Sequence, residues 1–517
     1  MKNIKILPIA LALFFSGCLY SCNDWLETGS NDEVLEDDAF SSAKGFRSAL
    51  IGVYRLVTSE NLYGQELTWG LLSSISWNYQ SGYAIPKYRG PLQYDVYTDN
   101  NTKTIVSNIW GAAYNAIANC NNLLKQIEGS NANFEYTWEK DMIMAEARGL
   151  RALLHFEMLR LFAPAPITGY KGTTIPYVTD YPDLLPQHKN TEEVLTSIIE
   201  DLEYAKQTLR PIDVDELRNK SIWIVNGNRM DNIEYVLFQG VLNLKSDGTR
   251  EGYGDGFFAF RGYRFNYWGA TALLARVYSY MRDNTKAEQY ADTILNDWVG
   301  SDKFHLYSKN PKATSNPNAI DGKRIPEPLI AFWNDKVCDN YKTAISSIYN
   351  RMVDPQYLFD GDLTEDYRYT DLYNSSNYRY RVWDGQDASY STNNSIVNYS
   401  NPLIPVLELP EIYLIKAECL AARGEIPKAL ALLKEIRDAR GCTNTVSASD
   451  YDSFMEKLVN EANRDFIARG QTWHFLKKLN WPKLYNGTPA NKTVPDGMFY
   501  PCQTVKLLII DFLNKAI

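Results

Sequence analysis

The clearest chemical signal in the chain is a cysteine near its start. Lys2 and Lys5 precede an apolar run, residues 6–15, that is too short to span a bilayer and is followed by small residues. This order is typical of a secretory signal. Ser21 stands directly before Cys22, as in a bacterial lipobox, whose cysteine is acylated and becomes the first residue of the mature chain. Each buried methylene of an acyl chain contributes ~0.8 kcal/mol, so several chains on one cysteine would hold the protein to a membrane.

The same stretch leaves two alternatives to acylation at Cys22. Cys18 is a weaker second acylation site, and an ordinary cleaved signal with an incidental cysteine is the other interpretation. We prefer Cys22 because polar residues begin directly after it. The sequence therefore predicts a signal peptide over residues 1–21 and a lipidated tether over residues 22–40.

Other residue types that support chemistry form no catalytic or metal-binding pattern. The four histidines are far apart and lack a zinc-ligand spacing. They are His155, His188, His305 and His474. The acidic stretch 360–366 lacks the glycine of a calcium-binding EF-hand loop, so we predict a solvated turn there. The glycines of residues 252–256 have the wrong spacing for a nucleotide-binding loop, and we predict a flexible loop. The sequence thus predicts no catalytic residue, no metal site and no cofactor.

Two arginines, Arg148 and Arg151, could bind an anionic ligand. They lie on one predicted helix together with Glu146 and Glu157. Charges on the same helix surface often pair with one another, so we predict structural ion pairs for both arginines.

Composition places the chain among exported globular proteins with net negative charge. It has 53 Lys+Arg and 62 Asp+Glu, a net charge of −9, and loss of residues 1–21 with their two lysines gives −11. This charge argues against nucleic acid as a partner. The cysteines beyond Cys22 show no redox or metal spacing, so we predict mostly buried free thiols. No later apolar run is long enough to span a membrane.

Nothing in the mature chain marks a boundary between separate domains. A Pro- or Ser-rich linker would divide a chain of this length, and none is present. We therefore predict a single domain over residues 41–517. Its N-terminal half would end at about residue 264 and its C-terminal half would cover residues 265–517.

Apolar residues recur at helical spacing through much of the chain. The predicted helices cover residues 42–57, 109–127, 142–162 and 191–209. Pro164 and Pro166 end the third, because proline has no amide proton and restricts the residue before it. Thr191 opens the fourth, with acidic residues in its first turn.

Two later segments share the small-residue spacing of tetratricopeptide-like hairpins. Ala275 and Ala287 are twelve residues apart on either side of a turn, and Ala417 and Ala429 repeat that spacing. Small side chains let two antiparallel helices approach closely. The sequence therefore predicts a mainly α fold of stacked helical hairpins with minor β-hairpins. Long, polar, aromatic-rich loops connect them over residues 61–101, 211–264 and 302–405.

Six stretches carry a resemblance that runs over nearly the whole mature chain. They are residues 22–26 (CNDWL), 145–152 (AEARGLRA), 272–278 (ALLARVY), 410–418 (PEIYLIKAE), 436–441 (IRDARG) and 470–473 (GQTW). In this order and spacing they resemble the SusD/RagB family of Bacteroidetes surface lipoproteins. The resemblance implies a SusD-like α-helical fold that covers a SusC-like TonB-dependent outer-membrane transporter. It also implies capture of oligosaccharides or, in some members, of peptides.

The chain departs from the family pattern at two charged positions. Where the family usually has arginine and glutamate, this chain has Glu408 and Arg469. We predict that these two residues form the same ion pair with its signs reversed.

The loops hold two clusters of side chains that could bind a sugar. Sugar rings present flat C–H faces that pack on Trp and Tyr, at ~0.5–1.5 kcal/mol per aromatic contact, while their hydroxyls need Asn, Asp or Arg partners. The candidate ligand-binding residues are Trp77, Asn78, Tyr79, Tyr83, Tyr88 and Arg89 in the first cluster, and Trp333, Tyr341, Trp383 and Tyr390 in the second. Packing within the loop is an equal alternative for each of them, and the family's ligand residues belong to no shared motif.

The sequence thus predicts a non-catalytic lipoprotein of the outer membrane, exposed at the cell surface, that captures oligosaccharide for a TonB-dependent transporter. A peptide-binding member of the same family is the first alternative. A surface glycoside hydrolase is the second, and it would need two carboxylates about 5 to 10 Å apart in a cleft. No motif in the chain marks such a pair.

Overall fold

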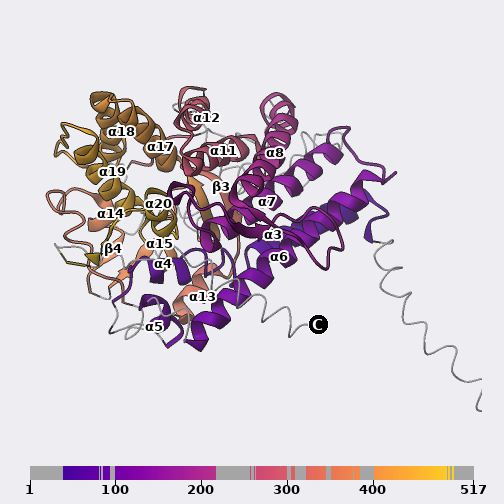
Figure 1. The fold of residues 1–517 in the computed structure, drawn as a ribbon, viewed down its shortest axis with the longest axis horizontal. Helices are drawn as coiled ribbons and strands as arrows, with labels where there is room; N and C mark the ends of the chain where they lie inside the picture. The colour runs from indigo at the N-terminus through magenta and orange to yellow at the C-terminus, as the bar shows by residue number, and fades with distance from the viewer. Residues whose placement is uncertain are drawn as a thin grey trace, which may run out of the picture.

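The protein, represented here by a computed structural model, is built mainly from α-helices (Figure 1). The structure describes residues 39–80, 82, 86–93, 99–216, 257, 261, 264–297, 299, 304–308, 322–344, 351–376, 378–384, 401–485, 487–488 and 492–493. The predictions for the signal peptide, Cys22, most of the tether, the loop at 252–256, Tyr83 and Tyr390 lie outside these residues. Among the helices that are described, none is both long enough and apolar enough to cross a bilayer.

Four long helices form the N-terminal part of the described structure. They are α3 (Ala43–Val57), α6 (Asn100–Glu128), α7 (Glu139–Phe162) and α8 (Thr191–Arg210). All four predicted helices are confirmed. Helix α6 begins earlier than its apolar pattern because the Asp99 side chain accepts a hydrogen bond from the Thr102 amide. Helix α8 begins at Thr191 with acidic residues in its first turn, as predicted, and its N-cap is Asn190, which forms a capping box with Glu193.

Helix α7 is the central element of this part, with almost every residue of its second half buried. It packs between α6 and α8. Gly149 is required there, because a Cβ at this position would lie 2.1 Å from the ring of Phe265. The helix ends at Phe162, directly before the predicted stop at Pro164 and Pro166.

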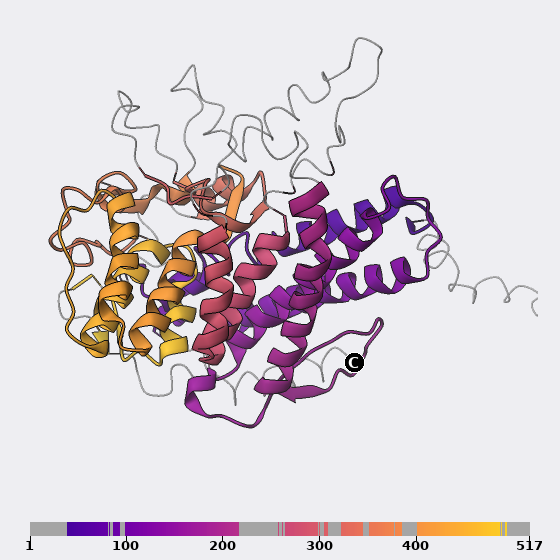
Figure 2. The same ribbon diagram turned by 90° about the horizontal axis from the view of Figure 1, so that it is seen from above.

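The two predicted tetratricopeptide-like hairpins are confirmed. Helix α11 (Tyr267–Met281) packs on α12 (Asn284–Asp297), and α17 (Leu409–Ala422) packs on α18 (Ile426–Ala439). The four alanines that carried the prediction are fully buried: Ala275, Ala287, Ala417 and Ala429. Helix α12 also contacts α17, and α19 (Tyr451–Phe466) follows on the other side of the second hairpin. Figure 2 shows these helices side by side between the N-terminal helices and the far end of the molecule.

Strands are few and pair in twos among the described residues. The longest pair joins β3 (Pro328–Trp333) to β6 (Leu403–Glu408) in antiparallel register. The other pairs are β1 (Thr173–Pro176) with β2 (His188–Asn190), β4 (Tyr373–Asn374) with β5 (Arg379–Tyr380), and β7 (Lys483–Leu484) with β8 (Lys492–Thr493). The shorter helical elements are α4 (Leu71–Ile75), α5 (Pro86–Leu92), η2 (Pro166–Thr168), η3 (Pro211–Glu216), α13 (Val337–Ala344), α14 (Tyr367–Thr370), α15 (Arg381–Asp384) and α20 (Thr472–Leu479).

Six arginines and six carboxylates form one continuous, buried ion-pair network in the C-terminal part of the described structure. Its members are Arg324, Glu327, Asp362, Asp366, Arg368, Glu408, Arg437, Arg440, Glu461, Arg464, Asp465 and Arg469. Asp465 lies at its centre. Burial alone would raise the pKa of this carboxyl group, but Arg440, Arg324 and Arg368 hold the pKa below its usual value.

This network confirms one prediction and corrects another. Glu408 and Arg469 do form an ion pair, with a closest N–O distance of 2.8 Å. The acidic stretch 360–366, however, is not a solvated turn. Asp362 and Asp366 are buried, because each carboxylate pairs with arginines from other segments of the chain.

Arg148 and Arg151 are structural, as predicted, but their partner is different. Both bind the carboxylate of Asp201 on α8, at 2.7 Å, and not Glu146 or Glu157. These ion pairs fasten α7 to α8. The described cysteines are buried free thiols, in line with the prediction: Cys120, Cys338, Cys419 and Cys442.

The Glu408–Arg469 pair yields a test by substitution. Glu408 also lies 3.3 Å from Arg324, so Glu408→Gln leaves two buried arginines without this carboxylate and should cost about 3–5 kcal/mol of unfolding free energy. Arg469→Gln should cost less, because Glu408 keeps Arg324. Chemical denaturation measures both values. Arg423→Gln, at an exposed pair with Glu288, is the matched control and should cost under about 1 kcal/mol. Equal costs for all three variants would contradict this account.

Two backbone contacts inside the core fix the tautomer of His155. Its Nδ1 lies 2.9 Å from the Arg151 carbonyl oxygen, and its Nε2 lies 3.0 Å from the Val178 amide nitrogen. The amide must donate, so Nε2 must be the unprotonated acceptor. Burial, the largest cause, lowers the pKa of His155 to about 3.

This shift predicts a pH dependence of stability. Below about pH 6.5 the unfolded chain binds a proton at His155 that the folded protein does not bind. The stability contributed by neutral His155 is therefore fully present above pH 6.5 and is lost as the pH falls toward 3. The expected slope is about 1.4 kcal/mol per pH unit. Denaturation at several pH values between 6.5 and 5 measures how the free energy of unfolding changes with pH. In His155→Gln this slope should be smaller by about 1.4 kcal/mol per pH unit, the contribution of one proton. An unchanged slope would contradict the assignment.

Candidate functional site

The first predicted aromatic cluster lies mostly inside the protein. Trp77, Asn78, Tyr79 and Tyr88 are each at most 6% exposed. Their polar atoms bind the protein itself: the Trp77 indole N–H donates to the Leu92 carbonyl oxygen at 3.1 Å, and the Tyr79 hydroxyl donates to the Trp69 carbonyl oxygen. Arg89 is exposed. These contacts favour packing over ligand contact for the four buried residues.

The second predicted cluster divides in the same way. Tyr341 is buried edge-on against Trp69, and Trp383 is buried with its indole N–H donating to the Ala468 carbonyl oxygen at 2.7 Å. Trp333, at the end of β3, is 36% exposed. Of the ten predicted ligand residues, Trp333 is therefore the described aromatic one whose ring reaches the surface.

Trp333 lines a groove of about 770 Å³ between α3 and the β3–β6 strand pair. We call it the α3–β3 groove. Its lining residues are Lys44, Arg47, Ser48, Ile51, Gly52, Tyr54 and Arg55 from α3, Ala331, Phe332 and Trp333 from β3, Leu403 from β6, and Phe257 and Arg264. Both apolar and polar side chains are among them. A volume of this size is in the usual range for sites that bind small organic ligands.

A buried carboxylate positions one wall of the groove. Glu146 on α7 accepts a hydrogen bond from the Tyr54 hydroxyl at 2.6 Å and pairs with Arg264 at 2.6 Å. The Tyr54 hydroxyl in turn accepts the Phe265 amide N–H at 2.9 Å. Burial, followed by the charge of Glu146, raises the pKa of Tyr54, so its hydroxyl stays protonated and keeps donating.

The strand pair positions the other wall. Trp333 pairs with Leu403 in the register of β3 and β6. The next residue, Asn334, donates through its amide side chain to the Thr58 carbonyl oxygen at 2.9 Å, which ties the end of β3 to the end of α3. Phe332 packs edge-on against Tyr54, with ring centroids 5.9 Å apart. These contacts hold the end of β3 against α3, where Trp333 lines the groove and is partly exposed.

A glycine keeps the groove open. Gly52 lies on the face of α3 that lines the groove, and a Cβ built there would meet no atom within 4 Å. A side chain at this position would therefore leave the helix without a clash at its Cβ. Gly111 on α6 is equally open but lies elsewhere.

The sequence did not predict that α3 contributes to the groove. Its apolar pattern marks the buried face of the helix, and the predicted ligand residues all lie in the predicted loops. The outer positions Lys44, Ser48, Ile51 and Arg55 follow helical spacing, and they include an apolar residue on the side opposite the core. That isoleucine was the available signal. It did not reveal which element faces α3.

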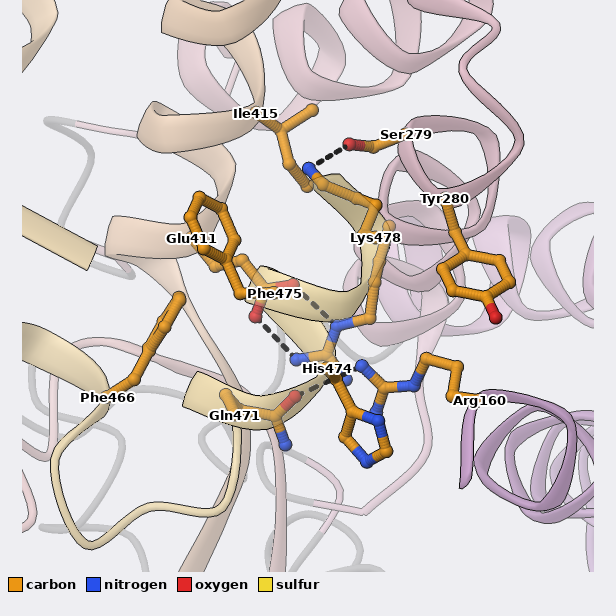
Figure 3. Close-up of a pocket in the computed structure, with 11 residues that line it drawn as sticks. Arg160, Ser279, Tyr280, Glu411, Ile415, Phe466, Gln471, His474, Phe475 and Lys478 are labelled. Carbon is orange, nitrogen blue, oxygen red and sulfur yellow. Dashed lines mark hydrogen bonds and ion pairs between the residues drawn. The ribbon is translucent and has the colours of Figure 1, made fainter. Parts of the chain in front are cut away.

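A second cavity lies deep between helices and is too small for a sugar. It measures about 20 Å³, room for one water molecule. Residues from α7, α11, α17 and α20 converge on it, as Figure 3 shows. Burial lowers the pKa of His474, which lies there close to Arg160 and Arg276. We assign this cavity to the packing of the helices.

Metal ligation is not evident in the part of the chain that the structure describes. No group of three or more His, Cys, Asp or Glu side chains there is arranged to hold a metal ion. The lining of the α3–β3 groove likewise includes no Asp or Glu among the described residues.

Comparison with known proteins agrees with this architecture. A family model described as starch-binding and associating with the outer membrane, SusD-like, matches residues 24–219. SusD-like protein P25 of Formosa agariphila is 25% identical over 222 residues, which are 42% of this chain and 41% of that protein. SusD-like protein P38 of the same organism is 20% identical over 97% of this chain and 96% of its own length. The chain is thus similar to SusD-like proteins along nearly its whole length.

Solved structures show the same fold. A SusD superfamily protein from Bacteroides thetaiotaomicron superposes with a TM-score of 0.61 at 18% identity, covering 90% of this chain and 93% of that one. A SusD-like carbohydrate-binding protein from Bacteroides vulgatus gives a TM-score of 0.60 at 16% identity, covering 86% and 85%. The SusD-like fold expected from the sequence motifs is thereby confirmed. At these identities the structures show the fold and not the ligand.

Proposed function

We propose that this protein is a non-catalytic, lipid-anchored binding protein of the outer cell surface. It captures oligosaccharide in the α3–β3 groove and delivers it to a SusC-like TonB-dependent transporter, its partner in the outer membrane. The family's described association with starch and the outer membrane supports the general role. The acyl anchor on Cys22, the surface exposure and the transporter belong to the proposal.

The observation that carries the proposal is the chemistry of the groove. Trp333 offers a flat apolar face on one wall, and Ser48 and the neighbouring cations offer hydrogen-bond donors on the opposite wall. Sugars need this combination, because C–H faces pack on rings while hydroxyls require polar partners. Two or three such contacts give reversible binding, which suits a protein that must release its ligand.

The groove gives no support to the glycoside hydrolase alternative. Hydrolysis of a glycosidic bond needs a pair of carboxylates about 5 to 10 Å apart on either side of the bond. The described lining of the groove holds none. The binding screen described below distinguishes a peptide ligand from an oligosaccharide ligand.

Substitution of Gly52 should block the groove without unfolding the protein. We expect Gly52→Trp to abolish binding in a screen of immobilised oligosaccharides and peptides, because the new side chain fills the groove. Folding should be retained, since a Cβ at this position meets no atom within 4 Å and glycine is a weaker helix former than tryptophan by roughly a few tenths of a kcal/mol. Gly111→Trp, at an open and exposed position on α6, is the matched control and should bind normally.

The same screen with Trp333→Ala should show weaker binding, whereas Tyr170→Ala, at a 40% exposed tyrosine away from the groove, should not. Peptide binding that Gly52→Trp removes would make peptide the ligand. Oligosaccharide binding that persists in Gly52→Trp would place the site elsewhere.

The anchor has its own test. Cys22→Ala should lose incorporation of labelled fatty acid and should leave the membrane fraction, because the acylated thiol is gone. Cys18→Ala is the matched control and should remain labelled. Labelling that survives in Cys22→Ala would assign acylation to another residue.

A further inference from the structure

The lining of the α3–β3 groove is positively charged, in contrast to the chain as a whole. Its charged members are Lys44, Arg47, Arg55 and Arg264, and no carboxylate is among the described lining residues. The complete sequence has a net charge of −9. A local excess of cations in an acidic protein is a feature of this groove and does not follow from composition.

Two of these cations are already compensated inside the protein. Arg264 pairs with Glu146 at 2.6 Å, and Arg47 pairs with Glu139 at 2.5 Å. Both also stand over the ring of Phe257, at 4.4 and 5.1 Å from its centroid. Their role is to build the wall of the groove.

The other two cations, Lys44 and Arg55, are exposed. Lys44 and Arg55 lie at the solvent side of α3, and neither forms an ion pair with any residue that the structure describes. Both line the groove. Charged side chains in this position are available to a ligand without first breaking an internal contact.

Their spacing suits an extended ligand. Eleven residues of α-helix separate Lys44 from Arg55, a rise of about 16 Å along the axis. Ser48 and Ile51 lie between them on the same face of the helix, and Trp333 lies on the opposite wall. A ligand along the groove would meet a cation near each end and apolar surface in the middle.

We infer that the ligand of the groove is an acidic oligosaccharide, one that carries carboxylate or sulfate groups along its chain. This inference rests on the proposed function and names the class of sugar. Arg55 offers a planar fork that matches an oxyanion with two hydrogen bonds, and Lys44 offers a compact ammonium group. Trp333 packs against a ring between the charged groups.

The experiment compares acidic sugars with neutral forms of the same backbone. Oligosaccharides of polygalacturonate, alginate and chondroitin sulfate are titrated into the full mature protein, each beside its carboxyl-reduced or desulfated form, together with neutral starch and xylan oligosaccharides. We expect binding by at least one acidic form and none by its neutral counterpart. Raising NaCl from 50 to 500 mM should weaken this binding because salt screens exposed charges.

Variants identify the cations that recognise the acidic groups. Lys44→Gln and Arg55→Gln should each lower the affinity for the acidic sugar about tenfold, the effect of losing one charge-assisted hydrogen bond. Lys457→Gln, at an exposed lysine on α19, removes the same charge elsewhere and should leave affinity unchanged. Melting curves should be the same for all three variants, since glutamine is a good helix former on the helix surface.

The outcomes separate this inference from the proposed function. Equal binding of acidic and neutral forms, with no loss in Lys44→Gln or Arg55→Gln, would overturn the acidic class while leaving oligosaccharide capture in place. Binding of neutral starch or xylan alone would do the same. Binding of no sugar in the panel would overturn both.

Discussion

Twelve buried charges hold the C-terminal part of the described structure together. Removing a charge from water costs several kcal/mol, and each member of the network recovers that cost only through its partners. The six arginines and six carboxylates come from segments that are far apart in sequence, so none of these segments has a satisfactory environment alone. Two members bear directly on the site. Glu327 precedes β3 and Glu408 ends β6, so the network fixes one end of the strand pair whose other end presents Trp333 and Leu403.

The opposite wall of the groove depends on a separate buried charge. Glu146 on α7 gathers Tyr54, Arg261 and Arg264 around one carboxylate. Arg261 also binds both carboxylate oxygens of Asp213, and one of these oxygens accepts the Tyr267 amide at the start of α11. The shape of the groove is thus set by two buried ionic centres, one on each side. Its exposed residues can vary in type without disturbing either centre.

The sequence was sufficient for the features that depend on local spacing. Apolar periodicity located α3 and α7, and the paired alanines located the hairpins α11–α12 and α17–α18, because a small side chain at a helix contact has a direct geometric reason. The Glu408–Arg469 pair was predicted from the resemblance to a family. Partners across long distances were not predictable in this way. Asp201 binds Arg148 from about fifty residues away, and the spacing of charges on one helix contains no information about another.

The sequence also could not predict which of the loop aromatic residues are buried. Trp77 and Trp333 are both followed by asparagine in the sequence, yet one is enclosed and the other reaches the surface. The difference lies in the neighbouring elements. The indole N–H of Trp77 donates a hydrogen bond to the Leu92 carbonyl oxygen, whereas Trp333 is the last residue of β3 and is partly exposed there. The groove itself needed α3 and β3 together, which are almost three hundred residues apart in the chain.

The position of α3 in the chain has a mechanical consequence. Among the described helices it is the first long one after the predicted tether, residues 22–40. Its outer face forms one wall of the groove. A pulling force on such a tether would act on α3 at its first residues, Ser42 and Ala43. The packing of the buried face of α3 and the hydrogen bond from Asn334 to the Thr58 carbonyl oxygen would resist that force. The same hydrogen bond would pass part of the load to the end of β3, so the strand that carries Trp333 lies on the load path.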